Sequence, residues 1–181
     1  MANKAEIEQF LKTEIRNYPA KVFSKDFIEE NGLTIGLLLD YTFHRDAQIA
    51  FRSAWLLEHV ILEDQSRLPQ IYEKLISLLG QQKNWSCIRS YSKLLMLGTK
   101  AKTGIAVTGD EEELIIEHVF NWLIDEDCPV AARVNCMDVL YALSSKHPWI
   151  KAELAAQINF LLQSPSAALA SRGKRILKRI L

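Results

Sequence analysis

The chain has 181 residues, of which 49% are hydrophobic and 24% charged, and its 22 basic residues balance 22 acidic ones. This length suffices for one substantial core, and the composition excludes a disordered chain. The neutral balance disfavours a dedicated nucleic-acid binder, because phosphate contacts require a clear basic excess. With only 7 glycines and 5 prolines, the chain is expected to form long helices rather than many short strands.

The cysteines and the N-terminal residues indicate the compartment. Cys87, Cys128 and Cys136 form neither an even set nor a CxxC pair, which is typical of buried thiols in a reducing environment. The opening segment MANKAEIEQF lacks the apolar region of a secretion signal, and no stretch approaches the 18 apolar residues of a membrane span. We therefore expect a cytoplasmic protein without a membrane partner.

The first predicted helix carries apolar residues at intervals of three and four, and it ends before Pro19. Those apolar residues are Ile7, Phe10, Leu11, Ile15 and Tyr18. Ser24 can cap a short second helix that stops at Asn31-Gly32, a pair suited to a left-handed C-terminal cap. Residues 1–32 are thus expected to form an N-terminal helical cap.

From residue 33 onward the apolar pattern predicts four helix pairs. The first helices are expected at residues 33–43, 68–79, 110–124 and 149–162. The second helices share a turn followed by a helix with an early arginine, in the segments DAQIAFRSAWLL, KNWSCIRSYSKLL, DCPVAARVNCMDVL and PSAALASRGKRIL. These arginines are Arg52, Arg89, Arg133 and Arg172. Because no pair can bury its apolar face alone, neighbouring pairs are expected to stack on a shared core.

These pairs resemble HEAT repeats, a family in which a turn aspartate commonly precedes a second-helix arginine by six positions and helps to form an inter-repeat ladder. Two pairs match that spacing and two depart from it. The matches are Asp46 with Arg52 and Asp127 with Arg133, and the departures are Lys83 and Ser166. The resemblance covers residues 33–181 and implies an all-α fold, a right-handed α-α superhelix of about four HEAT-like helix pairs after the N-terminal cap. We expect a single structural domain overall.

The longest irregular segment, residues 98–110, is expected to be a loop. It is not a P-loop, because five residues separate Gly98 from Gly104 and the required lysine and hydroxyl do not follow. Asp110 is expected to open the next helix in a capping box with Glu113.

Two Glu-His pairs, Glu58-His59 and Glu117-His118, are the nearest approach to a metal motif. Adjacent helix residues point about 100° apart, so neither pair can chelate one metal, and both histidines are expected on the surface. The chain contains no HExxH motif and no GxSxG elbow. We predict no catalytic residue, no cofactor and no metal.

The second helices supply the predicted binding surface. Steps of three and four place Arg52, Trp55 and His59 on one helix face, opposite an apolar stripe. The HEAT resemblance implies that second helices lie on the concave side, where arginines suit carboxylates or phosphates and an exposed tryptophan is a frequent anchor. The predicted binding residues are Arg52, Trp55, His59, Arg89, Lys93, Arg133, Arg172, Arg175 and Arg179.

The alternative for the same arginines is an inter-repeat ladder. We favour the ladder for Arg52 and Arg133, because each has its turn aspartate. Arg175, Lys178 and Arg179 have no acid nearby in sequence, and a solvated terminal helix is the favoured interpretation there.

The leading functional hypothesis is a non-catalytic protein–protein interaction scaffold whose concave face holds a protein or peptide, acidic in character. The alternative is a nucleic-acid-binding or DNA-repair protein resembling HEAT-like alkylpurine DNA glycosylases. The groove tryptophans and catalytic aspartate of those enzymes cannot be placed on this chain. A third hypothesis is a structural subunit whose apolar end, Ile180 and Leu181, pairs in an oligomer. The sequence decides neither the partner nor the oligomeric state.

Overall fold

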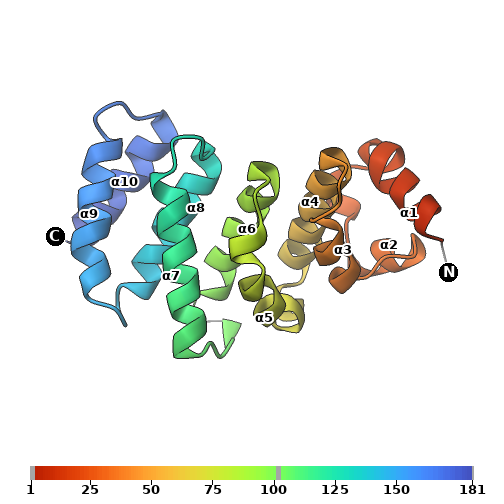
Figure 1. The fold of residues 1–181 in the computed structure, drawn as a ribbon, viewed down its shortest axis with the longest axis horizontal. Coiled ribbons are helices and arrows are strands. Elements are labelled where there is room, and N and C mark those ends of the chain that lie inside the picture. Colours follow the sequence, from red (N-terminus) through yellow and green to blue (C-terminus); the bar gives the residue numbers. More distant parts are fainter. Residues whose placement is uncertain (1–2, 101–102, 181) are drawn as a thin grey trace. The chain divides into compact units, whose positions relative to one another are not determined.

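The computed structural model describes residues 3–100 and 103–180, which form helices joined by turns and loops and contain no strand (Figure 1). The expectation of an all-α chain is therefore confirmed. The α-helices in this part of the chain are α1 (Lys4–Gln9), α2 (Lys25–Glu30), α3 (Ile35–Tyr41), α4 (Ala47–Glu63), α5 (Pro69–Ser77), α6 (Trp85–Gly98), α7 (Gly109–Ile124), α8 (Val130–Leu143), α9 (Trp149–Leu161) and α10 (Ala167–Ile180). A π-helical turn covers Phe10–Glu14, and 3-10 turns cover Ile15–Asn17, Ala20–Val22, Gln65–Arg67 and Leu79–Gln81. Leu181, which the oligomer hypothesis involves, lies outside the described residues.

The predicted alternation of first and second helices is confirmed from α3 onward. Helices α3, α5, α7 and α9 are the first helices, and α4, α6, α8 and α10 are the second helices, each with its early arginine. Helix α3 packs against α4, α7 against α8, and α9 against α10. None of the helices in the described part of the chain combines the length and apolar character that a bilayer crossing needs.

The chain divides into two compact units, Met1–Leu94 and Leu95–Leu181. Unit 1 runs from α1 into α6, and unit 2 runs from the last turn of α6 to α10. The division into a cap before residue 33 and an array after it stays a prediction, as does the single structural domain.

The beginning of unit 1 differs from the single long helix that the apolar spacing predicts. Asn3 caps α1 in a capping box with Glu6, and the helix then widens into the π turn before it ends in a 3-10 turn. Apolar spacing does not reveal these turns, because the residues that are buried here, Ile7, Phe10, Leu11 and Ile15, also fit the spacing of an ordinary helix. The cap and the end of α2 are confirmed, since Ser24 accepts a hydrogen bond from the Phe27 amide and Gly32 has a φ of 72°.

Small buried side chains from α4 and α6 meet in the core of unit 1. Ala50, Ala54 and Cys87 form a buried cluster between these helices. Nearby, the hydroxyl groups of Thr42 and Tyr91 share a buried hydrogen bond of 2.7 Å. The core of unit 1 therefore contains small buried side chains beside a hydrogen-bonded polar pair.

Helix α8 lies at the centre of unit 2 and contacts α7, α9 and α10. The predicted capping box of α7 is wrong by two residues, because Thr108 and Glu111 form it instead of Asp110 and Glu113. Gly173 marks the close approach of α10 to α9, since a Cβ built there would lie 2.9 Å from Ile158 Cγ2.

Candidate functional site

Arg52 on α4 does not pair with its turn aspartate, which corrects the favoured ladder interpretation for this residue. Its Nη1 donates hydrogen bonds to the carbonyl groups of Leu11 (3.2 Å) and Lys12 near the end of the first helix. The Asp46 carboxylate instead accepts from the Gln48 amide at the start of α4 and pairs with Lys12 Nζ at 2.7 Å. The hydrogen bond from Lys12 and the one from the Gln48 amide lower the pKa of Asp46. The Arg52 guanidinium and the Asp46 carboxylate therefore both hold the π turn at Leu11 and Lys12 against α4.

Trp55 is half-buried rather than exposed. Its ring meets the buried Phe23 ring edge-on at 4.9 Å between centroids and lies 5.3 Å from the half-buried His59 ring. Burial lowers the pKa of His59. The predicted neighbours Trp55 and His59 do lie together, but part of their surface is covered by the segment before α2.

Arg89 on α6 pairs with a carboxylate on the preceding second helix, α4. Glu58 on α4 is buried, and its Oε2 accepts from Ser90 Oγ at 2.7 Å and from Arg89 Nη2 at 3.4 Å. Lys93, one turn further along α6, is half-buried. An acid on one second helix thus receives the early arginine of the next second helix in unit 1.

Arg133 on α8 also departs from the expected pairing with its turn aspartate. Its Nη2 donates to the carbonyl groups of Asp125 and Glu126, and it forms no ion pair with Asp127. The arginine therefore stabilises the turn between α7 and α8 through the backbone.

The arginines of α10 dock onto α8 in unit 2. Arg172 forms an ion pair with Asp138, and Arg175 Nη2 lies 3.6 Å from the other oxygen of that carboxylate. One turn further on, the Arg179 guanidinium lies 6.0 Å from the centre of the Tyr141 ring. Asp138 was missed in the sequence, although a signal existed. It follows the early arginine of its helix by five positions, as Glu58 follows its own by six.

The predicted row of binding residues is thus divided between internal contacts and exposed groups. Arg52, Arg89, Arg133 and Arg172 all have partners within their own unit. Of the predicted row, Arg175 and Arg179 on α10 are the residues that are exposed. Helix α6 carries leucines at the positions equivalent to the acids of α4 and α8.

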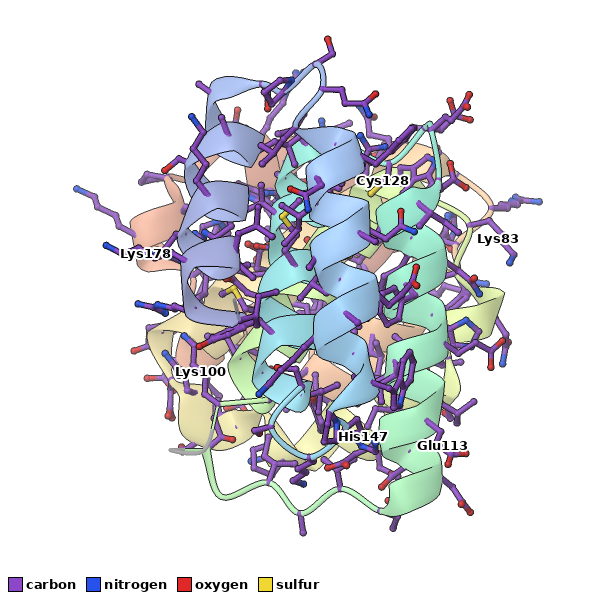
Figure 2. The ribbon with its side chains drawn as sticks, turned by 90° about the vertical axis from the view of Figure 1, so that its left-hand side faces the viewer. Lys83, Lys100, Glu113, Cys128, His147 and Lys178 are labelled. Atoms are coloured by element: carbon purple, nitrogen blue, oxygen red, sulfur yellow. The ribbon has the colours of Figure 1, made fainter. Side chains whose placement is uncertain are left out.

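Glu112, near the start of α7, forms a second buried charge cluster. It accepts hydrogen bonds from Lys146 and, at 3.0 Å, from His147 Nε2 (labelled in Figure 2). Burial raises its pKa, but the hydrogen bonds and charges of Lys146 and His147 outweigh burial, so the pKa of Glu112 is lowered overall.

A Glu112→Gln variant should therefore lose stability at neutral pH, by about 1–2 kcal/mol for charge-assisted hydrogen bonds. The lowered pKa means that the stabilisation is complete above the unfolded value of 4.5 and disappears as the pH falls through the folded value. Urea unfolding of both proteins from neutral to acidic pH checks this. A difference in unfolding free energy that stays constant into the acid range would contradict it.

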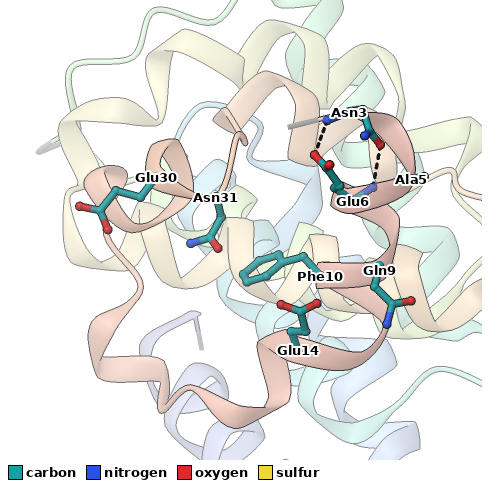
Figure 3. A pocket seen from close by; sticks show the side chains of 8 residues that line it. All are labelled: Asn3, Ala5, Glu6, Gln9, Phe10, Glu14, Glu30 and Asn31. Atoms are coloured by element: carbon teal, nitrogen blue, oxygen red, sulfur yellow. Dashed lines mark hydrogen bonds between the residues drawn. The ribbon is translucent and has the colours of Figure 1, made fainter. Parts of the chain in front are cut away.

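Each unit has a surface hollow lined by residues that the structure describes. In unit 1 a hollow of about 580 Å³ lies beside α1, the π turn and the end of α2 (Figure 3). Phe10 lines it together with three carboxylates, of which Glu6 already caps α1. In unit 2 a hollow of about 240 Å³ lies between the loop before α7 and the α7–α8 pair, beside Glu112 and Lys146. Each hollow is lined by apolar side chains together with polar or charged ones.

The cysteines are buried, and burial raises the pKa of each thiol. The values are about 12 for Cys87 and about 11 for Cys128, and the pKa of Cys136 lies well above its ordinary value. Thiols of this kind are poor nucleophiles, because the thiolate is the reactive form.

Comparison with known proteins gives one result for the chain as a whole. Residues 9–180 match a family model described as a HEAT repeat domain. No curated protein and no solved structure matches the chain.

Proposed function

Because the chain belongs to the HEAT repeat family, we propose that it is a non-catalytic interaction scaffold that holds an acidic protein or peptide on its second helices. HEAT repeats generally mediate protein interactions. The buried free thiols suit a reducing compartment, and we propose the cytoplasm.

The observation that carries this proposal is the exposed basic row of α10. Helix α10 contains five basic residues and no acid. Asp138, which lies against this row, is engaged by Arg172 and, at 3.6 Å, by Arg175 Nη2. Arg179 and the exposed part of the Arg175 guanidinium keep donors for a carboxylate of a partner, and arginine binds carboxylates with two parallel hydrogen bonds.

In unit 1 the predicted binding residues of α4 and α6 are less exposed to solvent than the two exposed arginines of α10. Trp55, His59 and Lys93 are half-buried, and each can offer only part of its side chain to a partner. We propose these residues as a secondary contact. The internal contacts of Arg52 and Arg89 stabilise their helices in either case.

Reversing the charge of Arg175 and Arg179 to glutamate should weaken the binding of a labelled poly-glutamate peptide about tenfold or more, because like charges then meet. Fluorescence anisotropy at low and moderate salt measures the affinity. The control is Lys151→Glu on α9, an exposed lysine on a first helix that undergoes the same charge change. Equal loss in the control, or no loss in the double variant, would overturn the assignment of α10.

Duplex DNA in the same assay tests the nucleic-acid alternative. Tighter binding of DNA than of the peptide, with an affinity that falls steeply with salt, would replace the present proposal. If the peptide result holds, affinity capture with the intact protein and the Arg175→Glu, Arg179→Glu double variant, followed by mass spectrometry, identifies the natural partner.

A further inference from the structure

Helix α9 exposes two large aromatic side chains on one side. Trp149 is 57% exposed and Phe160 is 66% exposed. Their separation of eleven residues is close to three full turns, so they lie on the same side of α9, about 16 Å apart along its axis. Glu153 and Ala156 lie between them at steps of four and three, and both are exposed. The opposite side of α9 is buried in unit 2 through Ile150, Leu154 and Ile158.

Helix α7 carries a second stripe with the same spacing. It consists of Glu113, Glu117, Phe120 and Ile124. The rings of Phe120 and Trp149 stack at 5.8 Å between centroids with an angle of 22°, so the two stripes meet there. Figures 1 and 2 show α7 and α9 side by side. Ile124, one turn beyond Phe120 at the C-terminal end of α7, is 55% exposed.

The two stripes, together called the α7–α9 surface, combine this apolar exposure with uncompensated negative charge. Glu113, Glu117 and Glu153 are free of ion pairs among the described residues. The turn that follows α7 adds three exposed acids, Asp125, Glu126 and Asp127, with one arginine, Arg133, held against the backbone of that turn.

The basic groups nearest in sequence do not neutralise this surface. Lys151 follows Trp149 by two positions, so it lies on another side of α9. Lys146 and His147 are engaged by the buried Glu112. The α7–α9 surface therefore presents large apolar side chains among acids.

We propose that the α7–α9 surface is a docking site for a basic amphipathic helix of a partner protein. Exposed aromatic clusters mark interaction sites, and apolar anchors three or four residues apart on a partner helix match stripes of this spacing. Lysines and arginines flanking the partner's apolar face would meet the glutamates, which steers the encounter and fixes its orientation. This site lies on first helices and has the opposite charge to the α10 row, so it takes a different partner.

Isothermal titration calorimetry tests the proposal with a synthetic amphipathic helical peptide made of leucine and lysine. A peptide in which glutamate replaces every lysine is the control. The lysine peptide should bind and the glutamate peptide should not. Phe160→Ala should weaken binding about tenfold, as expected for loss of an aromatic anchor. A Glu117→Lys, Glu153→Lys double variant should weaken it similarly and reduce its salt dependence.

Two controls separate this site from others. Lys151→Ala, on another side of α9, should leave the affinity unchanged. The Arg175→Glu, Arg179→Glu double variant should also leave it unchanged, so this proposal and that for α10 fail independently. Thermal melting of each variant shows that it is folded.

Wild-type affinity in folded Phe160→Ala and in the glutamate double variant would overturn the proposal. So would concentration-dependent self-association of the wild type that Phe160→Ala abolishes, because the occupant would then be a second copy. Sedimentation at two concentrations measures that outcome.

Discussion

A Leu57→Ala protein is expected to unfold with a free energy about 3 kcal/mol lower than that of the original chain. Leu57 is fully buried on α4, as are Leu56 and Ile61 on the same helix. Its truncation removes apolar contacts and leaves a cavity that close-packed neighbours fill only partly. Urea unfolding followed by circular dichroism gives the value. Leu57→Met, which nearly conserves volume, is the control and should lose less than about 1.5 kcal/mol. An equal loss in both variants would contradict the cavity argument.

Hydrogen exchange on the Leu57→Ala protein also tests whether the chain is a single structural domain. If it unfolds as one cooperative domain, slow amides in α8 and α10 should exchange faster by the same factor as those in α4. Acceleration confined to residues 1–94 would instead mean that the two compact units open separately.

Asp138→Ala should destabilise the protein by about 2 kcal/mol, because it removes the carboxylate that holds two arginines of α10. The loss should stay below the 3–5 kcal/mol typical of fully buried pairs, since the side chains of Arg172 and Asp138 keep some solvent contact. Equilibrium unfolding of Asp138→Ala, Arg172→Met and the double variant measures the coupling. A coupling energy near zero would show that the ion pair contributes nothing to the docking of α10.

The helices were predictable from the sequence because their apolar residues repeat at the helical period over long segments. Helix α9 was expected at residues 149–162 and spans Trp149–Leu161. The start of α7 was misplaced because two capping signals overlap there, and Thr108 was overlooked in favour of Asp110. The π turn at Phe10–Glu14 has no such signal, since its apolar residues satisfy an ordinary helix equally well.

The contacts of the arginines were less predictable, because they depend on which helices become neighbours. Local spacing suggested Asp46 as the partner of Arg52, yet that carboxylate caps its own helix and binds Lys12. The acid that receives Arg172 lies 34 positions earlier in the chain, at Asp138. A pattern within one helix cannot indicate a partner at that distance. The exposed aromatic side chains of α9, Trp149 and Phe160, were missed because the predicted binding surface was confined to second helices.

The burial of the three cysteines has a consequence for the sulfur chemistry of this protein. Each thiol is shielded from solvent and held in its protonated form. Oxidants and alkylating agents react with exposed thiolates, so the three thiols of the folded chain offer them almost nothing to attack. Such reagents reach the thiols only when the structure around them opens, so the oxidation of these thiols is governed by that local opening.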